Sequence, residues 1–529
     1  MKRLLALALS LTMIMGLTAC GGGTGKDTKD ESVSESTTAG QVKTEEDTKF
    51  GGTIVLPMDS EPSTLIAWKM RNDVEDYLAS IIYEPLLKCD ENGAPQPYLL
   101  DEFTPDAEAL TYTMKLKPGI KFHDGSDLDA EALKWNIDNY VENGILTSSF
   151  YSNVGSVEIS DDDKVIIHMT AWDSLLPYAM TRTCFMTSQK AFEEGGEAGL
   201  EAAPVGTGPF KFDTWEHGTR IKFVRFDEYW QGKPYLDGVT TEIYSETLVA
   251  QAAMEMGELH ALPSTDFDVA DEMAEKGYGI IKSAIPAKAF TLNYNSAAEG
   301  PLKDVRVRQA LSHAINGQEI VDTLCSGYAS VSNQWALEGT AQYNEELKGY
   351  EYDVEAAKKL LEEAGYPDGF EVTLTVRSYD LVVDTAQILI EQLAKIGVKV
   401  NFNPIEPANY STYLSNWDGL LLHTMGVSNS QYSQMSACFV QGVTTGLGVE
   451  SFIHPDDTNS AIVTAKGTGG EESEKMFREA VRLIFDEHCM VKPIFITDNV
   501  SVVSPKLHDS GINALAPNTN TLYKAWLEK

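Results

Sequence analysis

The chain has 529 residues, of which 43% are hydrophobic, and its formal net charge at pH 7 is −38. A domain usually runs to about 100–200 residues, so this length predicts two or three lobes, each with its own hydrophobic core. The charge excludes a nucleic-acid partner, because binding to phosphates requires clustered lysines and arginines.

The first residues predict a secretion signal. Two cationic residues precede an apolar run over residues 4–15, which is shorter than the roughly 20 residues that a membrane-spanning helix needs. The letters LTAC (17–20) resemble the bacterial lipobox, in which the chain is cut before a cysteine that then carries lipid. We therefore expect a signal peptide over residues 1–19 and a lipid anchor on Cys20. The alternative is an ordinary secretory signal with a chance cysteine.

Residues 20–49 predict a disordered tether, because after the cysteine they hold Gly, Ser, Thr and charged residues with almost no large apolar side chain. The remaining cysteines are widely spaced and contain no C-x-x-C pattern. They are Cys89, Cys184, Cys325, Cys438 and Cys489. This spacing predicts neither a disulfide framework nor a zinc site, and we expect small buried apolar side chains instead.

The first half of the body is predicted to be rich in strands. Apolar residues alternate over 112–116, and short apolar runs at 165–169 and 221–224 predict two further strands. Residues 161–163 are three consecutive aspartates. A calcium loop needs spaced oxygen ligands and a glycine, so a hairpin tip is the better interpretation here.

An α-β-α-β pattern follows over residues 353–402. Asp353 can cap a helix that ends at Gly365, and alternating apolar residues over 370–376 predict a strand. A second helix is predicted to end at Gly397, before another strand over 398–402. This alternation favours a mostly open sheet with helices on its faces.

Ligands of such sheets bind beyond the carboxyl ends of the strands. The strand over 370–376 is followed by Arg377 and Tyr379, and the later apolar run 420–422 leads to Met425, Gly426 and Asn429. We expect residues at both strand ends to line a pocket.

The sequence contains none of the motifs G-x-S-x-G, H-E-x-x-H, S-x-x-K or G-x-x-x-x-G-K-[ST]. Its histidines form no pair at i and i+4, so no helical metal site is predicted. The turn GTGP (206–209) could cradle an anion, but its proline removes a donor and a structural turn is favoured. We expect no enzyme activity, metal or cofactor.

Several blocks of residues match a known family in order and spacing. They are GGTIVLPMDSEPSTL (51–65), IYEPLLK (82–88), TYTMKLKPGIKFHDG (111–125), PVGTGPFKF (204–212), YWQGKPYLD (229–237), VRQALSHAIN (307–316), YDVEAAKKLLEEAGYPDGF (352–370) and LAKIGVKV (393–400). Over residues 50–528 the chain resembles the extracellular solute-binding proteins of family 5, which serve ABC importers of dipeptides, oligopeptides and nickel.

The resemblance implies an α/β, two-lobed periplasmic-binding-protein-like fold of class II, cluster C type, with a strand-rich subdomain inserted in the first lobe. The first lobe would comprise residues 50–81, 206–290 and 495–529, the inserted subdomain 82–205, and the second lobe 291–494. Solute would bind between the lobes, and the permease would recognise the closed form.

The resemblance also suggests ligand contacts. Arg377 lies near the position where dipeptide binders place an arginine on the ligand carboxylate, and its alternative role is a surface ion pair. Peptide binders hold the ligand ammonium with an aspartate, yet residues 423–432 (HTMGVSNSQY) contain no acidic residue. Asp418 or Glu61 could supply that charge from elsewhere, and Ser60, next to Glu61, is a further candidate contact. Four aromatic residues could stack on a ligand or pack in the core. They are Trp335, Tyr379, Trp417 and Tyr432.

The resemblance implies a binding lipoprotein that passes a short peptide or related solute to an ABC permease and ATPase complex. We expect a monomer anchored to the outer face of the cytoplasmic membrane, on the periplasmic side in a Gram-negative cell. The alternatives are a binding protein for a non-peptide solute, such as an oligosaccharide or a nickel complex, and a sensory ligand-binding lipoprotein.

Overall fold

The structure, a computed structural model, describes residues 45–70, 73–144, 151–336, 338–340, 342–427, 430–443 and 446–529. Residues 46–529 form one compact unit, to which the description below refers. Cys20, with the predicted signal peptide and most of the predicted tether, lies outside the described residues. Within the described part of the chain, none of the helices combines the length and the apolar character that crossing a membrane requires.

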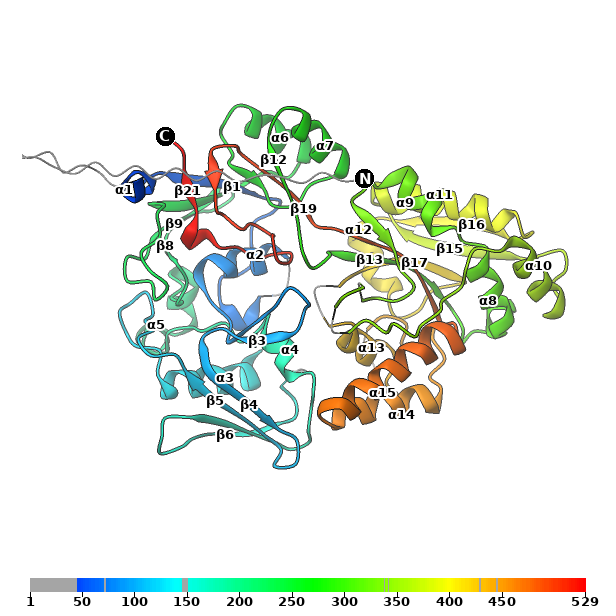
Figure 1. The fold of residues 1–529 in the computed structure, drawn as a ribbon, viewed down its shortest axis with the longest axis horizontal. Coiled ribbons are helices and arrows are strands. Elements are labelled where there is room, and N and C mark those ends of the chain that lie inside the picture. Colours follow the sequence, from blue (N-terminus) through cyan, green and yellow to red (C-terminus); the bar gives the residue numbers. More distant parts are fainter. Residues whose placement is uncertain are drawn as a thin grey trace, which may run out of the picture. The chain divides into compact units, whose positions relative to one another are not determined.

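A four-stranded sheet is formed by the start of the described chain and by residues 210–243 (Figure 1). In spatial order its strands are β1 (Thr53–Met58), β10 (Gly238–Ile243), β9 (Arg220–Arg225) and β8 (Phe210–Glu216). β1 runs parallel to β10, and the other pairs are antiparallel. β9 confirms the strand predicted at 221–224, and α2 (Asp73–Ile82) packs against β8.

Smaller elements complete this part of the structure. A three-stranded sheet has the order β11 (Ala261–Leu262), β19 (Val500–Val503), β12 (Gly279–Lys282), and α6 (Thr247–Glu255) and α7 (Phe267–Glu275) pack against it. β20 (Leu507–His508) pairs with β21 (Trp526–Leu527), and α1 (Glu45–Lys49) begins the described chain. The C-terminal segment therefore returns to the lobe in which the described chain begins.

Residues 82–205 contain a hairpin and a separate four-stranded antiparallel sheet. The hairpin joins β2 (Leu87–Cys89) to β3 (Pro95–Pro97). The sheet has the order β4 (Leu100–Asp106), β5 (Thr111–Leu116), β7 (Val165–Met169), β6 (Val154–Ile159). Three helices accompany it, α3 (Ala130–Asn143), α4 (Leu176–Met180) and α5 (Gln189–Ala202). As predicted, residues 161–163 lie in the turn between two antiparallel strands, β6 and β7.

The largest sheet has six strands. Their order is β14 (Ala329–Val331), β18 (Val491–Thr497), β13 (Lys288–Tyr294), β17 (Leu420–Gly426), β15 (Glu371–Arg377), β16 (Lys399–Ile405). β15 is parallel to both of its neighbours, whereas β13 is antiparallel to β17 and β18. The predicted α-β-α-β unit is confirmed as α10 (Val354–Glu363), β15, α11 (Asp380–Ala394) and β16.

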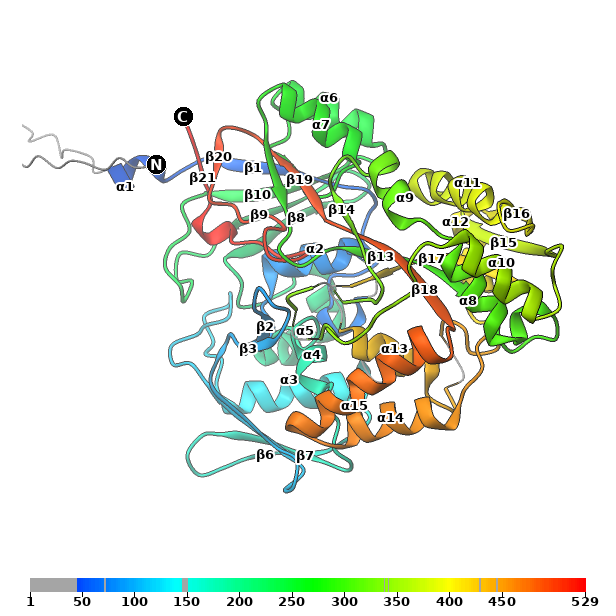
Figure 2. The same cartoon turned by 45° about the vertical axis from the view of Figure 1, so that its right-hand side comes forward.

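The remaining helices belong to the same region. They are α8 (Val305–His313), α9 (Gly317–Leu324), α12 (Pro407–Tyr410), α13 (Gln431–Phe439), α14 (Asp456–Gly467) and α15 (Gly470–Arg482). Short 3-10 turns are η1 (Ala67–Lys69), η2 (Pro301–Lys303), η3 (Ser411–Tyr413) and η5 (Leu522–Lys524), and η4 (Leu483–Glu487) is a π-helix. α14 and α15, orange in Figures 1 and 2, pack against each other.

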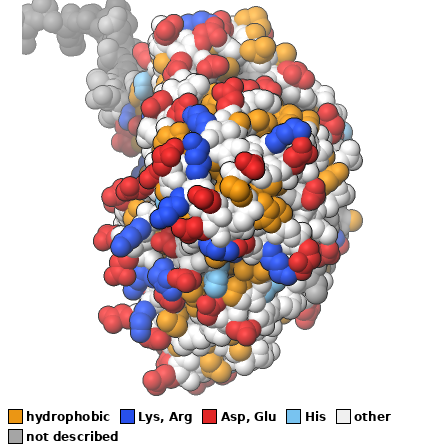
Figure 3. All heavy atoms as spheres, turned by 90° about the vertical axis from the view of Figure 1, so that its right-hand side faces the viewer, with side chains coloured by type: hydrophobic (Ala, Val, Ile, Leu, Met, Phe, Trp, Pro, Cys, Tyr) orange, Lys and Arg blue, Asp and Glu red, His pale blue; other side chains and the backbone are white. Residues whose placement is uncertain are grey.

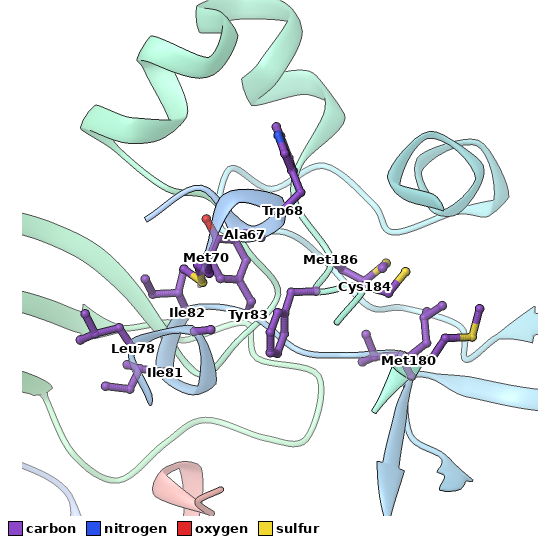
Figure 4. Close-up of a cluster of buried hydrophobic side chains, with 14 of the residues drawn as sticks. Ala67, Trp68, Met70, Leu78, Ile81, Ile82, Tyr83, Met180, Cys184 and Met186 are labelled. Atoms are coloured by element: carbon purple, nitrogen blue, oxygen red, sulfur yellow. The ribbon is translucent and has the colours of Figure 1, made fainter. Parts of the chain in front are cut away.

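One hydrophobic cluster joins the predicted first lobe to the inserted subdomain. Figure 4 shows Trp68 and Tyr83 in the same cluster as Met180, Cys184 and Met186. Tyr83 is 1% exposed, and its hydroxyl donates to the carbonyl of Leu65 at 2.8 Å. Two other clusters lie almost wholly within residues 290–496. All five cysteines in the described chain are free, and four of them are buried.

Two chain segments connect the two lobes. The amide of Ala287 donates to the carbonyl of Thr497 at 2.8 Å, and the amide of Ser283 donates to the carbonyl of Asn499 at 3.0 Å. A third contact lies at residues 173–175, in the inserted subdomain. There the Ser174 hydroxyl donates to the carbonyl of Ala465 at 3.0 Å, and Leu175 packs in a cluster formed mainly by the second lobe. The inserted subdomain is therefore docked on α14 and α15.

Candidate functional site

A cavity of about 550 Å³, which we call the main cavity, lies between segments of both lobes. One wall includes Asp59, Thr265 and Asn499, and the opposite wall includes Arg377 and Gly426. The second wall consists of the carboxyl ends of β15 and β17, where the sequence predicted a pocket. Ligand sites of proteins are typically concave and of about 300–1,000 Å³, so the main cavity is the candidate site for a solute.

Arg377 is held by aromatic side chains at the end of β15. Its guanidinium carbon lies 4.3 Å from the ring centroid of Tyr379 and 5.8 Å from that of Tyr410. Its Nε is buried and has no hydrogen-bond partner among the described residues. A guanidinium that is stacked on a ring but bound to no carboxylate is oriented for an oxyanion from outside the chain.

The neighbours of Arg377 leave its charge uncompensated. His423 lies on β17, and its Nδ1 is 3.0 Å from the hydroxyl of Tyr410. Burial lowers the pKa of His423 to about 4, and the charge of Arg377 acts in the same direction. Burial also raises the pKa of Tyr410, so both side chains are neutral at pH 7. Arg377 is therefore the charged member of this trio.

The wall of the main cavity is cationic, in contrast to the chain as a whole. Among the described residues it contains one carboxylate, Asp59, and three cationic side chains, Arg182, Lys288 and Arg377. Arg182 donates to Asp76 at 2.7 Å, whereas Lys288 has no side-chain partner among the described residues. Acidic and basic side chains are interspersed on the face shown in Figure 3. A concave cationic wall attracts anions, because low-dielectric walls focus the field of the charges.

The structure places the predicted site residues in different surroundings. Arg377, Tyr379 and Gly426 line the main cavity, and Trp335 lines a smaller cavity of about 40 Å³ beside it. Asn429 lies outside the described residues, as does Cys20. The main cavity therefore brings together three of the predicted residues, whereas Trp335 is 1% exposed and packs against Phe439 and Phe485.

Three others are packed in the core of the second lobe. Trp417 is 2% exposed and contacts Phe452 edge-on, and Met425 belongs to the same buried cluster. Tyr432 stacks on Phe477 with a centroid distance of 4.1 Å. None of the three lines one of the cavities described here. The packing of Trp417 and Tyr432 agrees with the structural alternative that the sequence left open. Met425 was expected in the pocket, but side chains of a strand alternate between its faces, and here Met425 is 6% exposed in the core while Gly426 lines the main cavity.

The predicted alternative carboxylates are engaged elsewhere. Asp418 accepts a hydrogen bond from the Thr373 hydroxyl at 2.7 Å, near the opposite end of β15 from Arg377. Glu61 accepts from the Gly218 amide at 3.0 Å and from the Trp215 indole at 2.9 Å. The hydrogen bond from Gly218 is the main cause of its lowered pKa.

The acidic residue in the wall of the main cavity is Asp59, which the sequence analysis did not single out. The hydroxyl of the predicted site residue Ser60 donates to Asp59 Oδ1 at 2.8 Å. Arg182 and Lys288 were also missed, because neither belongs to a motif or to a periodic pattern. Asp59 lies inside the block 51–65, so its place beside Ser60 was the one available signal.

Three of the blocks that carry the family resemblance, 82–88, 204–212 and 229–237, meet at Glu84. Glu84 is 3% exposed and accepts hydrogen bonds from Tyr98 and Tyr229 at 2.6 Å, Thr207 at 2.9 Å and Trp230 at 3.0 Å. These three blocks therefore join the inserted subdomain to the first lobe.

The GTGP turn is structural, as predicted. A Cβ on Gly206 would lie 2.2 Å from the carbonyl oxygen of Ile82, so only glycine permits this approach to α2. His123 Nε2 lies 2.9 Å from the carbonyl of Gly208, and the Gly206 amide donates to His123 Nδ1 at 3.3 Å. Among the described residues, no group of three His, Cys, Asp or Glu side chains could hold a metal ion.

Comparison with known proteins identifies relatives over most of the chain. Residues 94–444 match the family described as bacterial extracellular solute-binding proteins, family 5. The glutathione-binding protein GsiB of Escherichia coli O1:K1 / APEC is 30% identical over 362 residues, which are 67% of this chain and 69% of that protein. The corresponding GsiB of Salmonella paratyphi A is 29% identical over 363 residues, again 67% of this chain and 69% of the relative.

Solved structures show the same fold. The ABC transporter substrate-binding protein CtaP of Listeria monocytogenes superimposes with a TM-score of 0.82 at 22% identity, covering 91% of this chain and 100% of that one. The periplasmic binding protein DppA of Helicobacter pylori, in complex with the peptide STSA, gives a TM-score of 0.74 at 21% identity, covering 92% and 99%.

Proposed function

The chain belongs to family 5 of the bacterial extracellular solute-binding proteins, and from this premise we propose that it captures an anionic short peptide or a related small solute for an ABC importer. The cationic wall of the main cavity carries this proposal. Arg377 receives the ligand carboxylate in a bidentate contact, and Lys288 adds attraction for a second anionic group. The solute leaves the cavity chemically unchanged.

Asp59 supplies the counter-charge for a ligand ammonium. It is the one carboxylate that the described residues place in the wall of the main cavity, and it faces Arg377 from the other lobe. An ammonium buried without a partner costs several kcal/mol, which is comparable with a micromolar affinity of about −8 kcal/mol. Because no acidic residue occurs in residues 423–432, a carboxylate on the opposite wall is needed for a zwitterionic peptide.

The relatives support this class of ligand. GsiB is named as a glutathione-binding protein, and glutathione is a tripeptide with two carboxylates and one ammonium. The wall of the main cavity offers matching charges, with Arg377 and Lys288 for the carboxylates and Asp59 for the ammonium. Glutathione is therefore the first compound to test, with trialanine as a peptide that carries a single carboxylate.

Isothermal titration calorimetry of Arg377→Ala tests the proposal. The loss of a charge-assisted contact should weaken binding of glutathione or trialanine by more than about tenfold. Arg478→Ala is the matched control, because Arg478 is 42% exposed and pairs with Glu474 on the surface. An unchanged dissociation constant for Arg377→Ala would contradict the assignment, and so would conversion of the bound peptide into a product.

We also propose that the protein is attached to the outer face of the cytoplasmic membrane through lipid on Cys20. The letters LTAC (17–20) support this attachment. With acyl chains worth about 0.8 kcal/mol per buried methylene, two or three chains give stable anchoring. Cys20→Ser should move the protein from the membrane fraction to the soluble fraction and remove the mass of the lipid. An unmodified mass for the wild-type protein would contradict the anchor.

A further inference from the structure

A second cavity of about 430 Å³ lies between the first lobe and the inserted subdomain. It is lined mainly by apolar groups, among them Tyr83, Phe185, Ile285 and Leu515. An apolar cavity of about 150 Å³ is large enough to bind benzene. The second cavity therefore has room for a bulky aromatic or aliphatic group.

The second cavity adjoins the main cavity. Arg182, Pro517 and Asn518 line both, so a ligand in the main cavity can reach the second one past these residues. The charge of Arg182 in the wall shared by the two cavities is balanced, because Arg182 is paired with Asp76 at 2.7 Å. A single ligand can therefore occupy both cavities.

The shared wall is a fixed loop at residues 511–521. Asn513 is 2% exposed, and its side-chain amide donates to the carbonyl of Pro263 and to the hydroxyl of Ser501. Its Oδ1 accepts from the amide of Asn518 at 2.9 Å. Both asparagines have positive φ, 53° and 62°, a conformation that costs energy and is often found at functional sites. This loop is preorganised and does not need to form around the ligand.

The charged groups of the second cavity are already engaged. The Nζ of Lys88 lies 3.6 Å from the centroid of the Tyr98 ring, and Asp76 is paired with Arg182. Ala514 is exposed and lines this cavity, and its side chain is a single methyl group. The cavity thus offers apolar surface rather than a second site for ions.

We propose that the ligand is an anionic peptide-like molecule that carries a bulky apolar group, with its carboxylate at Arg377 and its apolar group in the second cavity. This proposal rests on the proposed function and narrows it. A peptide without such a group leaves the second cavity to water, whereas a benzyl or phenyl group buries its surface there and gains affinity.

Matched ligand pairs test the proposal. The pairs are glutathione with S-benzylglutathione, and trialanine with Phe-Ala-Ala. In the wild-type protein, the compound with the ring should bind at least about tenfold more tightly than its partner. Ala514→Trp fills the second cavity and should reduce this ratio of dissociation constants to about one. The control Ala274→Trp places a tryptophan at an exposed position of α7 and should keep the ratio.

The outcomes separate the two claims. If the smaller compounds bind through Arg377 but the ring adds nothing, the second cavity is not part of the site and the proposal is overturned while the function stands. The proposal is also overturned, and the function still stands, if Ala514→Trp leaves the ratio of dissociation constants unchanged. If neither pair binds the wild-type protein, the peptide function and the proposal are both overturned. Thermal unfolding of each variant shows whether a lost ratio reflects a lost fold.

Discussion

Glu84 shows how a single buried carboxylate can join separate parts of a lobe. Its four donors lie in the segment between β3 and β4 (Tyr98), in the turn before β8 (Thr207) and in the segment after β9 (Tyr229 and Trp230). A buried charge is tolerated only when its lone pairs are satisfied in this way. The resemblance is thus carried in part by residues whose role is structural, and it identifies the fold better than it identifies the ligand.

Glu84→Gln should destabilise the protein, because it replaces one of the two acceptor oxygens by an NH₂ group. The two donors that bound this oxygen then have no acceptor. We expect the free energy of unfolding to fall by about 3 kcal/mol. Glu299→Gln is the control, since its side chain is 86% exposed and, among the described residues, pairs only with Lys303, and the expected change is below about 0.5 kcal/mol. Urea titration measures both, and equal effects of the two variants would contradict this role of Glu84.

His123 should make stability depend on pH. One of its ring nitrogens donates and the other accepts, which requires the neutral ring, and burial lowers its pKa to about 4. The unfolded chain takes up this proton near pH 6.5, whereas the folded chain does so only near pH 4. The contribution of His123 to the free energy of unfolding is therefore fully present above pH 6.5. It decreases as the pH falls from 6.5 to about 4, by up to roughly 3 kcal/mol.

Urea titrations between pH 7 and pH 4.5 measure this dependence. His423 adds to it, because its pKa is lowered to about 4 as well. His123→Phe should unfold more easily at pH 7 but lose part of the decrease at low pH. A slope identical to that of the wild type would show that His123 does not carry the effect.

Part of the lining of the main cavity, the candidate site, was predictable where residues follow regular strands. Arg377, Tyr379 and Gly426 were found because they follow alternating or apolar runs, and such runs place their carboxyl ends at one edge of a sheet. Aromatic residues gave no such guide. Trp417, Tyr432 and Tyr379 are all aromatic, and only packing decides that the first two are buried while Tyr379 is exposed.

At the scale of elements, local patterns predicted the α-β-α-β unit closely. Asp353 accepts from the amides of Glu355 at 3.0 Å and Ala356 at 2.9 Å, as a capping residue should. The loop 511–521 could not be predicted in the same way. It has neither apolar periodicity nor a motif, and its shape depends on Pro263 and Ser501, which are distant in sequence.

Two turns of this unit touch through their backbones, and this contact requires glycine. Gly369 has φ 76°, and a Cβ there would lie 2.0 Å from the carbonyl oxygen of Gly397. Gly369→Ala should therefore cost more than about 3 kcal/mol of unfolding free energy, from strain and from displacement of the second turn. Gly365→Ala is the control, because Gly365 also has positive φ, 91°, but no atom within 4 Å of its Cβ position.

The control should cost only about 1 kcal/mol, the price of a positive φ without a clash. Chemical unfolding of both variants measures the difference. Equal losses would mean that the turns can move apart freely, and the close backbone contact would then have no energetic role.

At the scale of the whole unit, the contact at residues 173–175 holds the inserted subdomain on the second lobe. Lys466 Nζ lies 3.4 Å from Asp173 Oδ2, and the Asp173 side chain is 7% exposed. The Ser473 hydroxyl donates to that of Ser174 at 3.2 Å, and Leu175 is 6% exposed in the second-lobe cluster. These interactions would be broken if the lobes moved apart, so they favour the form in which the main cavity is enclosed.

Leu175→Asp should shift the equilibrium toward the separated form, because a carboxylate is poorly tolerated in the apolar contact but is harmless in water. Loss of the buried leucine alone removes about 2 kcal/mol from the docked form, which predicts at least about tenfold weaker ligand binding. Small-angle scattering should show a larger radius of gyration, with the melting temperature of each lobe little changed. Leu248→Asp on α6 is the control, since Leu248 is 73% exposed. An unchanged radius and affinity in Leu175→Asp would mean that the two connecting segments alone hold the lobes together.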